Sequence, residues 1–164
     1  MTDFIQTHVS GRAGVITLNR PAALNSLSLA MVRSMTNALH EWHSDRDISA
    51  VFVYGQGEKA YCAGGDIRFF HQAALAGDPQ LEDFFTEEYT LNHLIHHYPK
   101  PYVAFMDGIV MGGGMGLSQG AALRIVTEYT QIALDAIIRE NHPELRDHLI
   151  AQTDLRMEQY HGAR

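Results

Sequence analysis

Apolar residues follow two spacings along this chain, and the two spacings predict strands and helices in alternation. Short apolar or alternating runs bounded by glycine, proline or polar residues are typical of strands. These runs cover residues 4–8, 13–18, 51–54, 102–105, 123–128 and 130–135. Segments in which apolar residues recur every three or four positions are typical of amphipathic helices. They cover residues 28–44, 67–76 and 80–97, a helix from Leu117 onward, and residues 137–164. This alternation predicts an α/β fold with right-handed β-α-β crossovers.

Polar residues at the boundaries support these predicted helices. Ser26 or Ser28 can cap the first helix, and Asp66 can cap the second. The sequence AGDP at residues 76–79 ends the second helix. Residues 136–164 are predicted to form a helical tail, separate from a core at residues 1–135 and available for oligomerisation.

Two of the predicted strands run into glycine-rich loops that open onto helices. One loop contains the glycines at residues 64–65, and the other contains three glycines at residues 112–114. The first N–H groups of a helix have no partner inside it, and glycine allows a ligand to approach the backbone closely. We expect each loop to aim one N–H group at the same oxygen, which would make an oxyanion hole.

Three segments together resemble the consecutive signatures of the crotonase (enoyl-CoA hydratase/isomerase) superfamily. They are NRPAALNSL at residues 19–27, KAYCAGGDIR at residues 59–68 and MGGGMGLS at residues 111–118. The motifs FFTEEYTLN at residues 84–92 and KPYVA at residues 100–104 are similar to those of the 3-hydroxyisobutyryl-CoA hydrolase branch. The resemblance covers roughly residues 4–133. It implies a ClpP/crotonase spiral of β-β-α units, incomplete at the C-terminus.

The resemblance also implies roles for individual residues. Gly65 and Gly113 would supply the two oxyanion-hole amides, and Glu88 matches an acidic residue that contacts substrate in the hydrolase branch. From the sequence alone, an isolated helical glutamate such as Glu88 is expected to be a solvated surface group. The remaining implied acyl-CoA contacts are Ala23, Leu24, Ala63, Gly64, Asp66, Ile67 and Gly112. Coenzyme A would be part of the substrate, and no other cofactor is expected.

The sequence departs from the family pattern at two places. Gly116 stands where hydratases carry a catalytic glutamate, and Asp135 and Ala136 stand where hydrolases carry a proline and a catalytic glutamate. Hydrolysis of a thioester needs both carbonyl polarisation and a carboxylate that activates water or attacks. The resemblance therefore implies a 3-hydroxyisobutyryl-CoA hydrolase of valine catabolism in which Glu88 or another group replaces the missing carboxylate. The alternatives are a catalytically silent acyl-CoA-binding or assembly protein and an enoyl-CoA hydratase or isomerase.

Three other chemistries fit the sequence less well. Cys62 has no assignable base, so it is predicted to be a small buried residue rather than a nucleophile. His93, His96 and His97 have helical spacing but no acidic or cysteine partner, so no metal site is expected. The glycines at residues 112–116 are out of register with a dinucleotide fingerprint.

Charge and composition narrow the choice of partners. The formal net charge is −7 and basic clusters are absent, which argues against nucleic acids and anionic membranes as partners. The single cysteine rules out an internal disulfide and suits a reducing compartment. The N-terminus lacks the features of a signal peptide, so a cytoplasmic protein is the simplest expectation. The resemblance implies a homo-oligomer, either a trimer or a hexamer.

Overall fold

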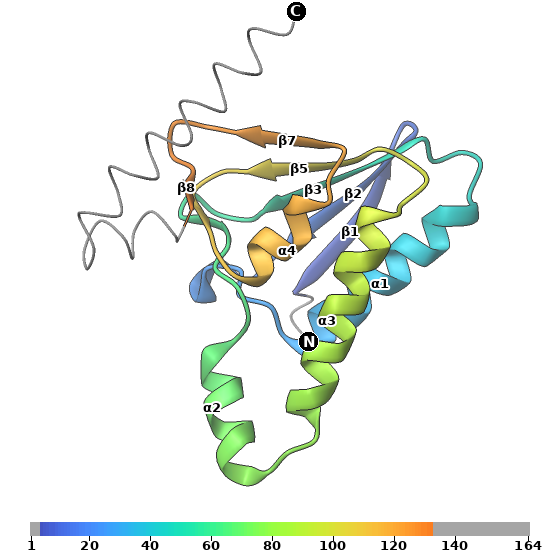
Figure 1. Cartoon of the computed structure of the whole chain (residues 1–164). Helices are drawn as coiled ribbons and strands as arrows, with labels where there is room; N and C mark the ends of the chain where they lie inside the picture. The colour runs from blue at the N-terminus through green and yellow to red at the C-terminus, as the bar shows by residue number, and fades with distance from the viewer. Residues whose placement is uncertain (1–3, 133–164) are drawn as a thin grey trace, which may run out of the picture. The chain divides into compact units, whose positions relative to one another are not determined.

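A computed structural model of the chain describes residues 4–132 (Figure 1). The chain divides into two compact units, Met1–Thr130 and Gln131–Arg164. In the second unit only the short strand β8, Gln131–Ile132, is described. The predicted helical tail at residues 136–164 lies outside the described residues.

Five strands form the main sheet of the first unit, in the order β1-β2-β3-β5-β7. Strand β1, Ile5–Ser10, pairs antiparallel with β2, Ala13–Leu18, as the predicted hairpin requires. The other neighbouring strands are parallel, which confirms the predicted α/β class with crossover connections. These strands are β3, Ala50–Gly55, β5, Tyr102–Met106, and β7, Leu123–Val126.

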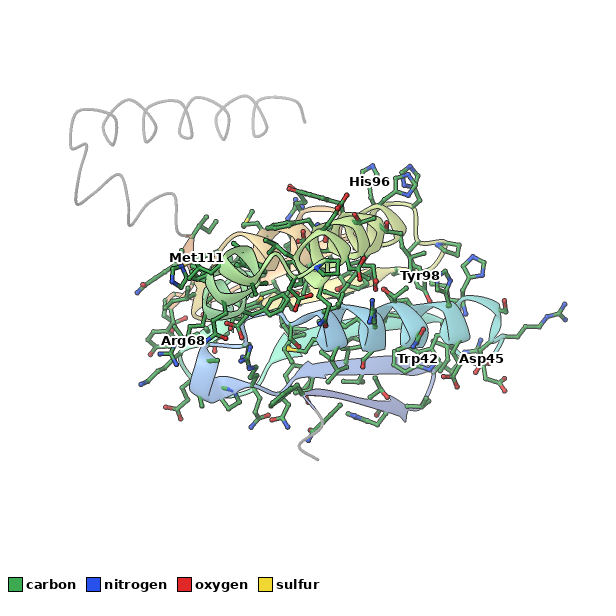
Figure 2. The ribbon with its side chains drawn as sticks, turned by 90° about the horizontal axis from the view of Figure 1, so that it is seen from below. Trp42, Asp45, Arg68, His96, Tyr98 and Met111 are labelled. Atoms are coloured by element: carbon green, nitrogen blue, oxygen red, sulfur yellow. The ribbon has the colours of Figure 1, made fainter. Side chains whose placement is uncertain are left out.

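Helices α1 and α3 lie side by side over one face of this sheet (Figures 1 and 2). Helix α1, Leu29–Ser44, begins after Ser28, whose hydroxyl accepts a hydrogen bond from the Met31 N–H at 3.3 Å. Of the two predicted caps, Ser28 is therefore the one that the helix uses. The apolar stripe of α1 is buried as predicted. It consists of Leu29, Met31, Val32, Met35, Ala38, Leu39 and Trp42.

Helix α2, Ile67–Ala76, has the predicted bounds. The carboxylate of Asp66 accepts hydrogen bonds from two amides of its first turn at 3.1 and 3.2 Å, which makes Asp66 the predicted cap. Gly77 ends the helix at a φ of 62°, a left-handed conformation that suits glycine. Helix α3, Gln80–His96, then runs back and packs against α1 and α2.

The structure corrects the sequence-based prediction around the two glycine loops. Strand β4, Ala60–Cys62, pairs in parallel with β6, Ile109–Val110, and the sequence patterns predicted no strand at either place. Strands of two or three residues are too short to show periodicity. Helix α4, Gly113–Gln119, begins four residues before the predicted start at Leu117. Glycine has a low helix propensity, so the pattern placed the start at the first large apolar residue.

Asn25 holds the loop between β2 and α1 in place. It is fully buried and has a φ of 55°, which asparagine tolerates better than most residues. Its amide nitrogen donates to the carbonyl oxygens of Gln56 at 3.0 Å and Ala60 at 2.8 Å. Its amide oxygen accepts from the Arg20 N–H at 2.9 Å. One side chain therefore ties this loop to β4 and to the connection that precedes it.

We expect Asn25→Ala to lower the free energy of unfolding by about 2–4 kcal/mol, because it leaves buried backbone groups without partners. Alanine also fits the left-handed backbone less well than asparagine. Denaturant unfolding would measure the effect, with Asn37→Ala on the exposed side of α1 as the matched control. A loss no greater than that of the control would contradict the role given to Asn25.

Candidate active site

The two glycine loops lie against each other. A Cβ added to Gly64 would be 3.3 Å from the Met111 carbonyl oxygen and 3.6 Å from the Gly113 nitrogen. The Met111 N–H donates to the Cys62 carbonyl oxygen at 3.0 Å, next to the β4–β6 pair. Figure 2 shows Arg68 and Met111 at one end of the first unit, away from Trp42. Gly64 also has a φ of 99°, a backbone conformation that L side chains rarely adopt, so glycine suits this junction.

A parallel bridge to Leu27 sets the direction of the Gly65 amide. The Leu27 N–H donates to the Gly64 carbonyl at 2.7 Å, and the Asp66 N–H donates to the Leu27 carbonyl at 2.9 Å. In a parallel bridge of this kind, the residue between the two bonded groups turns its own N–H away from the partner. Within residues 4–132 nothing accepts a hydrogen bond from the Gly65 N–H. This amide is available to a ligand.

The start of α4 leaves a second amide available. Gly112 has a φ of 44° and a ψ of −115°, a conformation that is natural only for glycine. Gly113 follows as the first residue of the helix, so its N–H has no acceptor inside the helix. The next amide, that of Gly114, is already bonded to the Met111 carbonyl at 2.7 Å. In the described part of the chain, the Gly113 N–H has no acceptor either.

A pocket of about 390 Å³ joins four of the residues that the resemblance assigned to the site. They are Gly65, Glu88, Gly112 and Gly113. Phe70, Phe84 and Phe85 form an aromatic cluster on its wall, with ring centroids 4.8 to 5.5 Å apart. The sequence gives no signal for this cluster, because α2 and α3 bring its members together only in the folded chain. The pocket therefore combines two available amides with an apolar wall.

Glu88 is buried at the pocket, with only 7% of its surface exposed. The expectation of a solvated glutamate is wrong, because Glu88 lies on the face of α3 that also buries Phe84 and Leu91. Its Oε1 accepts a hydrogen bond from the Asn92 amide at 3.1 Å. A Cβ on Gly113 would be 3.3 Å from the same oxygen. A carboxylate thus stands beside one of the two available amides.

The other assigned contacts lie outside this pocket. Ala63 and Gly64 belong to the first glycine loop, and Ile67 is 75% exposed at the start of α2. Ala23 ends a short 3-10 helix, Pro21–Ala23. Leu24 lines a second pocket, of about 420 Å³, together with Lys59. The structure thus separates the assigned residues into a group at the pocket and a group along the neighbouring surface.

Asp66 is occupied by structural contacts. Its carboxylate caps α2 and forms an ion pair with Arg20 at 2.7 Å. Partial burial acts to raise the pKa of the Asp66 carboxyl, but hydrogen bonds from Arg20 and from the amides of Phe69 and Arg68 outweigh it and lower the pKa. The negative charge of Asp66 is therefore used by Arg20 and by the first turn of α2. These contacts hold in place the loop that contains Gly65.

Cys62 is unsuited to nucleophilic chemistry. Burial raises the pKa of its thiol to about 12, so the thiolate is scarce at neutral pH. Its sulfur lies 3.8 Å from the Gly64 carbonyl oxygen, to which it donates. The interpretation of Cys62 as a small buried residue agrees with this environment.

The described residues bring no metal-binding group together. Among residues 4–132, no cluster of three or more histidine, cysteine, aspartate or glutamate side chains is arranged to hold a metal ion. The rings of His93 and His97 stack instead, with their centroids 4.2 Å apart on the exposed side of α3. No helix in the described ranges combines the length and the apolar character that crossing a membrane requires.

Asn92 and Gly116 are two pocket residues to which the sequence analysis gave no contact role. A Cβ on Gly116 would be only 2.5 Å from the Asn92 amide nitrogen. Glu88 and Asn92 are four residues apart, and side chains at this spacing are neighbours on a helix. This spacing could have predicted their contact from the sequence. The Asn92 side chain therefore occupies the space into which a side chain at position 116 would extend.

Comparison with known proteins places this site in a family. A family model described as Enoyl-CoA hydratase/isomerase matches residues 13–137, which is well over half of the chain. This chain belongs to the enoyl-CoA hydratase/isomerase family. The match covers both glycine loops and Glu88, so every residue at the pocket lies inside the family's segment.

Several relatives carry the name of one branch of the enoyl-CoA hydratase/isomerase family. The chain is 52% identical over 124 residues to "3-hydroxyisobutyryl-CoA hydrolase, mitochondrial" of Danio rerio, and 45% identical over 124 residues to the protein of that name from Homo sapiens. Each match covers 76% of this chain and 32% of the relative. The predicted similarity to this branch is confirmed, and the chain spans about a third of the length of these curated relatives.

Solved structures confirm the predicted crotonase fold. An enoyl-CoA hydratase from Rhodobacter sphaeroides 2.4.1 matches with a TM-score of 0.76 and 44% identity, over 79% of this chain and 39% of that chain. A carnitinyl-CoA dehydratase from Mycobacterium thermoresistibile matches with a TM-score of 0.78 and 43% identity, over 80% of this chain and 38% of that chain. The fold is thus shared by family members whose names describe different reactions.

Proposed function

We propose that this chain acts on acyl-CoA thioesters as a hydrolase of the 3-hydroxyisobutyryl-CoA type. The observation that carries the proposal is the meeting of two available amides, on Gly65 and Gly113, with the buried carboxylate of Glu88 at one pocket. The names of the relatives support the choice of substrate, which would place the reaction in valine catabolism. The chain spans about a third of the length of those relatives, so their names alone do not assign the complete hydrolysis reaction to it.

The two amides would act on the thioester carbonyl. Its oxygen would accept hydrogen bonds from the Gly65 and Gly113 N–H groups, which stabilise the negative charge that develops when the carbon is attacked. Glu88 would take a proton from a water molecule as the water oxygen bonds to the carbonyl carbon. The tetrahedral intermediate would then collapse and break the C–S bond. Coenzyme A would leave as a thiolate that takes up a proton.

Two observations weigh against hydratase chemistry at this pocket. Position 116, where hydratases carry a glutamate, is a glycine, and Asn92 fills the adjacent space. A longer side chain at position 116 would have to displace the Asn92 amide before it reached the pocket. Glu88 is the one carboxylate among the described residues that lines the pocket. Hydration of a double bond would therefore have to rely on one carboxylate.

The second candidate function is binding of acyl-CoA without turnover. It is favoured by Asp135 and Ala136, which stand where the hydrolases carry a proline and a catalytic glutamate. Both residues lie outside the described part of the chain. In this case the two amides would still hold the thioester, and the chain would serve as a binding or assembly protein within a homo-oligomer.

Single-turnover release of free thiol from 3-hydroxyisobutyryl-CoA, with calorimetric binding on the same sample, would test the proposal. Turnover above the uncatalysed rate supports the hydrolase, and binding without turnover supports the second candidate. Isobutyryl-CoA, which lacks the hydroxyl group, is the matched substrate for acyl specificity. If neither substrate binds, both functions are excluded for this chain.

A further inference from the structure

Asn92 is the residue that holds the Glu88 carboxylate. It lies one turn further along α3, and its Nδ2 donates to Glu88 Oε1 at 3.1 Å. The neighbouring Glu87 is held differently, by an exposed bidentate pair with Arg33 at 2.6 and 2.8 Å. In the part of the chain that the structure describes, neither a basic group nor a second donor contacts Glu88. Among residues 4–132, Asn92 therefore supplies the one hydrogen bond that holds this carboxylate.

The environment of Asn92 determines which way its amide faces. Its nitrogen must face Glu88, because the opposite orientation would set two acceptor oxygens against each other. This leaves Oδ1 enclosed and without a hydrogen-bond partner. Enclosed polar atoms without partners are rare in folded proteins and call for a reason. Leucine would fill similar space without that cost, so an asparagine here indicates a task for its donor group.

Position 116 gives the Asn92 side chain the space that it occupies. A Cβ on Gly116 would lie 2.5 Å from Asn92 Nδ2 and 2.9 Å from Asn92 Oδ1. Both atoms are at the end of a side chain that can swing aside, so a methyl group at position 116 would displace the amide rather than disrupt the backbone. Gly116 and Asn92 thus form one unit: the glycine on α4 has no side chain, and the Asn92 side chain from α3 fills the space beside it.

We propose that Asn92 is a positioning residue, which holds Oε1 of Glu88 so that Oε2 faces the water or thioester in the pocket. This inference rests on the proposed hydrolase function. A glutamate side chain has several rotatable bonds, and a donor to one oxygen restricts the direction of the other. Within residues 4–132, Oε2 has no hydrogen-bond partner. Unlike Asn92 Oδ1, it is not enclosed, so a small molecule can reach it. Oε2 is thus the oxygen left for chemistry.

Asn92→Leu removes the donor while keeping a side chain of similar size. We expect the hydrolysis rate to fall about tenfold or more, because a small misplacement of a reacting group is costly. KM, the affinity for a thioether analogue of the substrate and the melting temperature should stay close to those of the unmodified chain. Asn37→Leu, on the exposed side of α1, is the matched control. An unchanged hydrolysis rate, or a change in KM alone, would overturn the proposal.

Gly116→Ala tests the same unit from the other helix. We expect it to reproduce the loss of rate by displacing Asn92, while the added methyl group raises the helix propensity of α4. Its effect should not add to that of Asn92→Leu, since both break one hydrogen bond. If the double variant lost rate by the product of the two single losses, the two substitutions would not act through the same hydrogen bond.

A readout independent of turnover separates this proposal from the proposed function. If the unmodified chain hydrolyses no thioester, the hydrolase function fails. Labelling of Glu88 by a water-soluble carbodiimide, followed by mass spectrometry, then tests Asn92 directly. We expect faster labelling of Glu88 in both Asn92→Leu and Gly116→Ala than in the unmodified chain or Asn37→Leu. Equal labelling rates in all four proteins would overturn the positioning role.

Discussion

Replacing Glu88 by glutamine is expected to lower the rate of thioester hydrolysis by about 10²–10⁴-fold, the range that a positioned acid or base contributes. Acyl-CoA affinity should change by about twofold or less, because the substrate is held by interactions that the variant keeps. Single-turnover thiol release would measure the rate, and calorimetry with a thioether analogue would measure the affinity.

The physical reason lies in what glutamine keeps and what it loses. Its amide oxygen can still accept the hydrogen bond from Asn92, so the side chain can hold its buried position. Gly65 and Gly113 still line the pocket, so the proposed polarisation of a carbonyl by their amides is kept. The variant loses only the ability to take a proton from water. A selective loss of rate would therefore assign the water-activating group.

Glu87→Gln is the matched control for this experiment. Glu87 is the preceding residue of α3, its carboxylate pairs with Arg33, and neither of these two residues lines the pocket. We expect its rate to stay close to that of the unmodified chain. Equal losses of rate in the two variants would point to a general effect on α3. An unchanged rate in both would show that Glu88 does not activate the water.

The sequence was most informative where local chemistry decides the structure. Asp66 and Gly77 gave both ends of α2 correctly, because a cap and a left-handed terminator act within one turn. The stripe on α1 predicted its buried face for a similar reason. The family motifs added the crotonase fold, which periodicity alone could not have distinguished from other α/β folds.

The sequence was least informative where distant segments meet. Glu88 reads as a surface residue until α3 packs beside α4, and its burial is a property of that packing. The same is true of Asn92 and Gly116, which lie on different helices and share one space. Strands β4 and β6 are so short that only their partners define them. The roles given to Gly65, Gly113 and Glu88 therefore stay predictions that the proposed measurements test.

Gly114→Ala is expected to destabilise the fold by about 3 kcal/mol or more, at the upper end of the cost of overpacking. A Cβ at this position would be 2.2 Å from the Cys62 carbonyl oxygen, which is a backbone atom. That oxygen accepts the Met111 N–H at 3.0 Å and belongs to the last residue of β4. It cannot retreat without breaking this bond and shifting the loop that carries Gly65.

Thermal and denaturant unfolding would measure the effect of Gly114→Ala, and a loss of this size corresponds to a fall in melting temperature of roughly 6–12 °C. Gly116→Ala is a control in the same helix, because the atoms nearest to its methyl group belong to the Asn92 side chain, which can move, and not to the backbone. The two variants should separate stability from rate. Gly114→Ala should destabilise the junction of the two glycine loops, and Gly116→Ala should leave that junction folded but slow the reaction. Equal stability of the two variants would mean that the Cys62 carbonyl can move, and that the amides of Gly65 and Gly113 are less firmly held than these contacts imply.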